Sequence, residues 1–159
     1  MAKIATVMTN LFEDVEYTDP AKALKEAGHE VVVISSEKGK KIEGKQKEAT
    51  VTADAGIGDV SPSDFDALFI PGGFSPDQLR DDERFVSFAK NFADNGKPIF
   101  AICHGPQLLI TAGVLKDRKV TGYNSIKVDL INAGANFVDE EVAVSGGHST
   151  ENHLPFFQN

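Results

Sequence analysis

A single cysteine, Cys103, occupies the position in this sequence best suited to nucleophilic chemistry. The apolar run 98–102 before it is typical of a buried strand, and the segment 105–110 after it is typical of the start of a helix. A sharp strand-to-helix turn crowds the backbone two residues on either side of the nucleophile, and those positions hold the small residues Ala101 and Gly105. The sequence therefore predicts a nucleophile elbow with Cys103 at its tip.

The surroundings of the elbow predict a reactive thiol. The positive end of the following helix and its unpaired N–H groups favour a thiolate, so we expect a lowered pKa for Cys103. Two glycines follow the apolar run 67–70 and should reach the same edge of a parallel sheet. The backbone N–H groups of Gly72, Gly73 and His104 are therefore candidates for an oxyanion hole. The alternatives are an inert buried cysteine and a plain glycine turn.

Three acidic residues, Glu13, Asp14 and Glu16, follow the first apolar run 4–8 and should reach the same sheet edge. A carboxyl beside a thiolate must be protonated to donate a hydrogen bond, because two adjacent negative charges disfavour each other. We assign that role to Glu16. The alternatives are a solvated acidic loop and a metal site, of which the metal site is disfavoured because no histidine accompanies the cluster.

Alternating strand-like and helical segments must position these residues. The expected strands are 4–8, 30–35, 67–70, 98–102 and 142–144. Such alternation predicts an α/β fold with a parallel sheet covered by helices on both faces. A helix is expected over 20–27, with Asp19 as its N-cap and Gly28 just past its end. The segment 36–60 breaks the alternation and predicts a hairpin beside the sheet.

A buried helical stripe adds to this core. Phe85, Phe88, Ala89 and Phe92 recur at helical spacing within 81–95, so we assign them to the core.

Composition limits the classes of function. A chain of 159 residues with 41% hydrophobic content predicts one domain, 1–159. The formal charge of -8 argues against nucleic acid and anionic membranes as partners. A lone cysteine forms no internal disulfide and fits a reducing compartment, so we expect a cytoplasmic protein. The N-terminal segment is typical neither of a signal peptide nor of a membrane span.

Four motifs make the chain resemble a known family. They are 12–16 (FEDVE), 66–73 (DALFIPGG), 101–107 (AICHGPQ) and 131–135 (INAGA). In order and spacing they are similar to the ThiJ/PfpI superfamily, specifically its PfpI-type branch, described as intracellular cysteine peptidases and as glyoxalase III-like enzymes or deglycases. The resemblance covers 3–144. The tail 145–159 diverges, and we assign no role to His148 or His153.

The resemblance implies a fold and a site. The fold is a flavodoxin-like three-layer sandwich with a mainly parallel sheet and a nucleophile elbow, similar to class I glutamine amidotransferases. Cys103 is the implied nucleophile and Glu16 its protonated partner, with backbone donors as above and no cofactor or metal. The resemblance also implies a homodimer or a higher oligomer, in which Asp77 of a neighbouring subunit orients His104. Family peptidases carry Glu at that position.

These observations favour a cysteine-dependent stress-protection enzyme acting on reactive dicarbonyls or glycation adducts. The thiolate would add to a small carbonyl compound, and Glu16 would move a proton between its carbons. A PfpI-type intracellular cysteine peptidase with peptide substrates is the first alternative. It is weaker because adjacent residues in an elbow diverge, which predicts that His104 points away from Cys103. The second alternative is a non-catalytic redox-sensing stress protein with an oxidised Cys103.

Overall fold

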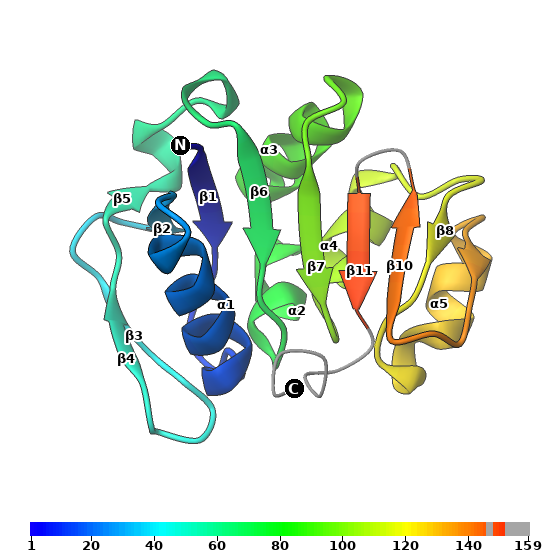
Figure 1. Cartoon of the computed structure of the whole chain (residues 1–159), viewed down its shortest axis with the longest axis horizontal. Helices are drawn as coiled ribbons and strands as arrows, with labels where there is room; N and C mark the ends of the chain where they lie inside the picture. Colours follow the sequence, from blue (N-terminus) through cyan, green and yellow to red (C-terminus); the bar gives the residue numbers. More distant parts are fainter. Residues whose placement is uncertain (146–147, 152–159) are drawn as a thin grey trace.

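The computed structural model of the chain describes residues 1–145 and 148–151, and its centre is a twisted sheet (Figure 1). The strands of this sheet are β1 (Lys3–Val7), β2 (Glu30–Ser35), β5 (Ala55–Gly56), β6 (Ala67–Ile70), β7 (Ile99–Ile102), β10 (Val142–Ser145) and β11 (His148–Glu151). Their order is β10-β11-β7-β6-β1-β2-β5. Neighbouring strands are parallel, except that β10 and β11 are antiparallel.

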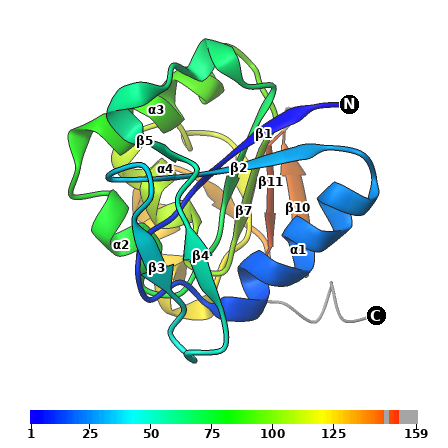
Figure 2. The same ribbon diagram turned by 90° about the vertical axis from the view of Figure 1, so that its left-hand side faces the viewer.

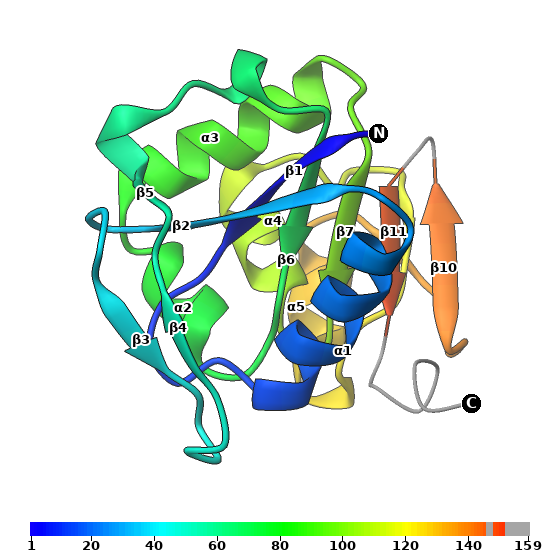
Figure 3. The same cartoon turned by 60° about the vertical axis from the view of Figure 1, so that its left-hand side comes forward.

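Helices cover both faces of the sheet and complete three layers (Figure 2). The helices are α1 (Asp14–Glu26), α2 (Ser75–Leu79), α3 (Glu83–Asp94), α4 (Pro106–Ala112) and α5 (Lys127–Asn132). One core cluster includes Tyr17 and Ala21 of α1, and the other includes Phe88 of α3 and Leu108 of α4. Figure 3 shows α1 and α3 on opposite sides of the strands. The expected flavodoxin-like α/β sandwich is therefore confirmed.

The apolar pattern of the sequence locates most core elements correctly. The expected strands over 30–35 and 67–70 match β2 and β6. The expected strand 4–8 is shifted by one residue relative to β1, and the expected strands 98–102 and 142–144 differ from β7 and β10 by one residue at one end. The phenylalanine stripe of α3 is buried as expected, since Phe85, Phe88 and Phe92 are each at most 4% exposed.

The expectation for the first helix is wrong at its beginning. α1 begins at Asp14, so Pro20 lies inside the helix rather than at its first turn. Proline removes one backbone N–H from a helix and so destabilises it. Here burial of the face that carries Tyr17, Pro20 and Ala21 against the sheet stabilises the helix in spite of that loss. The acidic residues are also not in a loop, because Asp14 and Glu16 lie in the first turn, where the helix dipole favours negative charge.

The segment between β2 and β6 contains the expected hairpin. Strands β3 (Lys41–Glu43) and β4 (Thr50–Thr52) pair in a separate antiparallel ribbon before the chain returns to the main sheet at β5. A second small sheet pairs β8 (Lys119–Val120) with β9 (Asn136–Phe137). Among the described helices, none has both the length and the apolar character needed to cross a bilayer.

The sequence beyond β10 is described only in part. Within the divergent tail 145–159, the backbone of 148–151 forms β11 beside β7. Residues 146–147 and 152–159 lie outside the described residues, as do the side chains of His148 and His153.

Candidate active site

The turn between β7 and α4 is the predicted nucleophile elbow. Cys103 adopts a left-handed backbone conformation with φ 59°, and the N–H of Gly105 donates to the carbonyl of Ile102 at 2.7 Å. A Cβ atom on Gly105 would lie 2.5 Å from the carbonyl oxygen of Ile70. The small residue at this position is therefore required by the close approach of the neighbouring strand β6.

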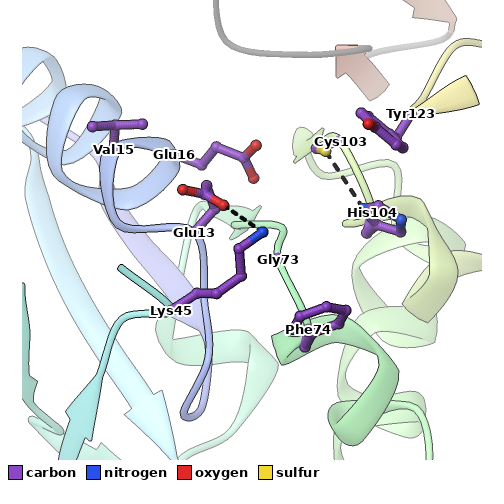
Figure 4. Close-up of a pocket in the computed structure, with 9 residues that line it drawn as sticks. All are labelled: Glu13, Val15, Glu16, Lys45, Gly73, Phe74, Cys103, His104 and Tyr123. Atoms are coloured by element: carbon purple, nitrogen blue, oxygen red, sulfur yellow. Dashed lines mark hydrogen bonds and ion pairs between the residues drawn. The ribbon is translucent and has the colours of Figure 1, made fainter. Parts of the chain in front are cut away.

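Cys103 opens into a pocket of about 500 Å³ at the carboxyl edge of the sheet (Figure 4). The residues that line it are Glu13, Val15, Glu16, Lys45, Gly73, Phe74, Cys103, His104 and Tyr123. They come from α1, from the β3–β4 hairpin, from the turn after β6, from the elbow and from the segment after β8. Crevices at this edge of parallel sheets are where ligands bind in many α/β proteins.

Glu16 lies beside the nucleophile at the base of this pocket. Its carboxyl group faces the Cys103 thiol (Figure 4), and its Oε1 accepts the N–H of Gly72 at 3.1 Å. Burial raises the pKa of Glu16 to about 7, and the negative charge of Glu13 adds to this effect. The bonds from Cys103 and Gly72 and the charge of Lys45 act in the opposite direction. Glu16 is therefore poised to take up or release a proton near neutral pH.

Gly72 makes room for this pair. A Cβ atom there would overlap Oε1 of Glu16 and would lie 3.0 Å from the Cβ of Cys103. Its N–H points to Glu16, so it is not directed at a substrate oxygen while that bond holds. Gly73 lines the pocket and has φ 76°, a conformation that glycine adopts without steric cost.

The expected lowering of the thiol pKa is wrong. Burial raises the pKa of Cys103, and so do the negative charge of Glu16 and the hydrogen bond to it. The backbone N–H of His104 favours the thiolate but does not offset these effects. Cys103 therefore keeps its proton while Glu16 is ionised, and the two groups titrate as a pair.

His104 points toward the thiol, so the expectation that it faces away is also wrong. Its Nδ1 lies 3.5 Å from Sγ of Cys103, and its Nε2 lies 3.1 Å from Oγ of Ser125. The ring also packs on Tyr123, with the ring centroids 4.9 Å apart. Burial lowers the pKa of His104, as does the charge of Lys45, while the charge of Asp77 partly opposes the shift. A neutral imidazole is therefore favoured at neutral pH.

Asp77 lies outside the pocket lining. It is in α2, its side chain is 67% exposed, and its Oδ1 lies 3.9 Å from Nε of Arg80 in the same helix. Its action on His104 of a neighbouring subunit stays a prediction.

The β3–β4 hairpin brings a lysine to the site that the sequence analysis did not identify. Nζ of Lys45 lies 2.9 Å from Oε2 of Glu13 and 5.3 Å from the centre of the Phe74 ring. Asp14 holds the hairpin tip in place. The N–H groups that its carboxylate accepts are those of Gln46 at 2.7 Å, Glu48 at 3.0 Å and Ala49 at 2.8 Å.

Asp14 thus has a structural role distinct from that of Glu16 two residues later. Within the described residues, no group of three or more His, Cys, Asp and Glu side chains is arranged to hold a metal ion.

Comparisons with known proteins show the family to which the chain is related. The model of the DJ-1/PfpI family matches residues 2–155. General stress protein 18 of Bacillus subtilis (strain 168) is 67% identical over 142 residues, which are 89% of this chain and 83% of that protein. Protein/nucleic acid deglycase 2 of Escherichia coli (strain K12) is 51% identical over 153 residues, which are 96% of this chain and 89% of that protein.

A solved structure has a similar fold. It is a two-domain protein from Anabaena variabilis ATCC 29413 with DJ-1/ThiJ/PfpI-like and ferritin-like domains. The match has a TM-score of 0.93 and 38% identity, and it covers 96% of this chain and 44% of that one.

Proposed function

Because this chain belongs to the DJ-1/PfpI family, we propose that it is a cysteine-dependent enzyme acting on reactive dicarbonyls or on glycation adducts. The observation that carries the proposal is the buried, adjacent pair of Cys103 and Glu16, in which the pKa of Glu16 is raised to about 7. An acid–base group with a pKa near the working pH is suited to proton transfer. The relative named as a deglycase supports the reaction class.

The first step is addition of Cys103 to the aldehyde of a dicarbonyl such as methylglyoxal. Ionised Glu16 takes the proton from the thiol as Sγ bonds to the aldehyde carbon, and the carbonyl electron pair moves onto oxygen. Glu16 then returns that proton to the new oxyanion. The product is a hemithioacetal, and Glu16 is again a carboxylate.

The second step moves a proton between the two carbons of the substrate. Glu16 removes the proton from the former aldehyde carbon, which gives an enediolate, and delivers it to the neighbouring carbon. The hydroxyl proton on the former aldehyde oxygen passes to the neighbouring oxygen in the same rearrangement. The former aldehyde carbon is thereby oxidised to a thioester while the ketone carbon is reduced to an alcohol. Water then cleaves the thioester, releasing lactate and restoring the Cys103 thiol. The net reaction consumes one dicarbonyl and one water and needs no cofactor.

Backbone donors would stabilise the negative oxygen in these steps. We assign this role to the N–H groups of Gly73 and His104, because the N–H of Gly72 is bonded to Glu16. Glycation adducts would react through the same addition step, with the adduct's thiol or amine as leaving group. The name of the Escherichia coli relative includes nucleic acid. The negative charge of this chain predicts that it does not bind nucleic acid, and this stays a prediction.

A PfpI-type cysteine peptidase is the second candidate, favoured by the contact of 3.5 Å between Nδ1 of His104 and Sγ of Cys103. In this reaction His104 takes the thiol proton, and Cys103 forms an acyl-enzyme with a peptide. The role of Asp77 here requires a homodimer or a higher oligomer. A redox-sensing role is weaker, because the site raises the pKa of the thiol and oxidation follows thiolate character.

The experiment is lactate formation from methylglyoxal by the purified protein without glutathione. Cys103→Ala and Glu16→Gln should each reduce the rate to background, since one lacks the nucleophile and the other the proton carrier. Glu26→Gln is the matched control, because Glu26 is an exposed carboxylate at the far end of the same helix. Wild-type lactate formation no faster than that of Cys103→Ala would refute the dicarbonyl reaction. Peptide hydrolysis by the assembled protein would then be measured.

A further inference from the structure

The imidazole of His104 is held by a segment that the proposed mechanism has not used. This segment, 121–126, links β8 to α5 and passes over the elbow. It contributes the Tyr123 ring, which packs on the imidazole, and the Ser125 hydroxyl, which bonds to Nε2.

The segment is fixed at both ends, so the place of Ser125 is well defined. The N–H of Tyr123 donates to the carbonyl of Cys103 at 2.9 Å, which ties the segment to the elbow itself. The N–H of Thr121 donates to the buried Oγ1 of Thr150 at 2.8 Å, and the side chain of Ile126 is 3% exposed. The hydroxyl of Ser125 is therefore presented by a short segment anchored in the core on either side of it.

We propose that Ser125 is the positioning residue for His104, acting within one chain. Its Oγ accepts the Nε2–H of the imidazole, which leaves the lone pair of Nδ1 facing Sγ of Cys103. The imidazole is then a second acceptor for the thiol proton beside Glu16. The proton can pass to Nδ1, leaving a thiolate, and the resulting imidazolium keeps its Nε2–H bonded to Ser125 until it returns the Nδ1 proton to the new oxyanion. The effect of Ser125 on turnover rests on the proposed function, whereas its effect on the tautomer of the His104 ring does not.

The resemblance assigned this orienting contact to Asp77 of a neighbouring subunit. In this chain Ser125 already makes it, and Asp77 is largely exposed beside Arg80. A hydroxyl is uncharged, so it orients the ring while stabilising the imidazolium less than a carboxylate would. Ser125 is also exposed to water, which limits the expected effect on turnover to about tenfold.

The direct test is the tautomer of His104, measured by long-range 1H–15N correlation spectra at neutral pH. The signals are assigned by their loss in His104→Gln. Wild type and Ser125→Thr should show the Nε2–H tautomer, and Ser125→Ala should show a mixture. Asp77→Asn should match wild type. An Nδ1–H tautomer in wild type would overturn the proposal. So would a Ser125→Ala spectrum identical to that of wild type, or a tautomer change in Asp77→Asn instead of in Ser125→Ala.

Kinetics give a second readout. In Ser125→Ala the kcat for lactate formation should fall about tenfold with KM within about twofold, and Ser125→Thr should recover it. Ser87→Ala, on the exposed side of α3, is the matched control. If wild type forms no lactate, the proposed function fails, but the tautomer and the rate of Cys103 alkylation by iodoacetamide still decide the role of Ser125. Equal alkylation rates in wild type and Ser125→Ala would count against it.

Discussion

Replacing Glu16 with glutamine should change how the stability of this protein depends on pH. The folded protein raises the pKa of Glu16 from 4.5 to about 7, chiefly by burial, so the carboxyl binds its proton more tightly when folded than when unfolded. The stability it contributes is complete below the unfolded pKa and is lost as the pH rises through the folded pKa. Glutamine is neutral at every pH and can keep accepting the N–H of Gly72, so the Glu16→Gln variant lacks this loss.

The magnitude follows from the two pKa values. For a single group shifted from 4.5 to about 7, the loss of unfolding free energy is about 0.8 kcal/mol at about pH 5 and about 3.3 kcal/mol at about pH 8. The advantage of Glu16→Gln over wild type should therefore grow by about 2.5 kcal/mol between these pH values. Cys103 adds little to this difference, because its raised pKa keeps the folded thiol protonated over this range.

The assay is urea unfolding followed by circular dichroism at both pH values, for wild type, Glu16→Gln and the exposed control Glu26→Gln. Glu26→Gln should differ from wild type by nearly the same amount at both pH values, because exposed carboxylates contribute little. A difference between Glu16→Gln and wild type that does not change with pH would refute the raised pKa. It would also remove the basis for proton transfer by Glu16.

Two further substitutions test the supports of the site. Gly72→Ala should lower lactate formation about 100-fold with little change in circular dichroism, since its methyl group displaces the Glu16 carboxyl. Gly58→Ala is the control, because its added Cβ meets nothing within 4 Å. Equal rates of lactate formation in the two variants would contradict the packing argument. Asp14→Asn should lower the unfolding free energy in urea by about 1–3 kcal/mol, because it weakens the bonds to the hairpin tip. The exposed Asp94→Asn should change it by less than about 0.5 kcal/mol, and similar losses in both would show that Asp14 does not hold the hairpin.

The sequence was sufficient to predict the parts of the site that depend on local backbone geometry. The elbow follows from a buried strand, a helix and small residues at 101 and 105, all of which lie within a few positions of Cys103. The parallel sheet then places Glu16 at the same edge. These features follow from periodicity and sterics, which a single sequence displays.

Electrostatics and long-range contacts were less accessible. The lowered thiol pKa was inferred from the helix dipole, but burial and the charge of Glu16 outweigh it. Ser125 lies 21 positions from His104, in a segment with no recognisable motif. Lys45 reaches the pocket because Asp14 fixes the hairpin tip, and no pattern in the sequence predicts the contact between Asp14 and the hairpin.

The left-handed conformation of Cys103 implies a compromise between folding stability and catalytic activity. A residue with a Cβ atom costs about 1–3 kcal/mol in this region of backbone space, whereas glycine occupies it freely. Selection for a robust scaffold alone would therefore favour glycine at position 103. A chain that keeps a cysteine there has a lower folding stability than one with glycine, and on the proposed function this loss of stability is tolerated because the thiol is the nucleophile. Lineages that lose the activity would be released from this constraint, so the elbow is the place where an inactive descendant would be expected to change first.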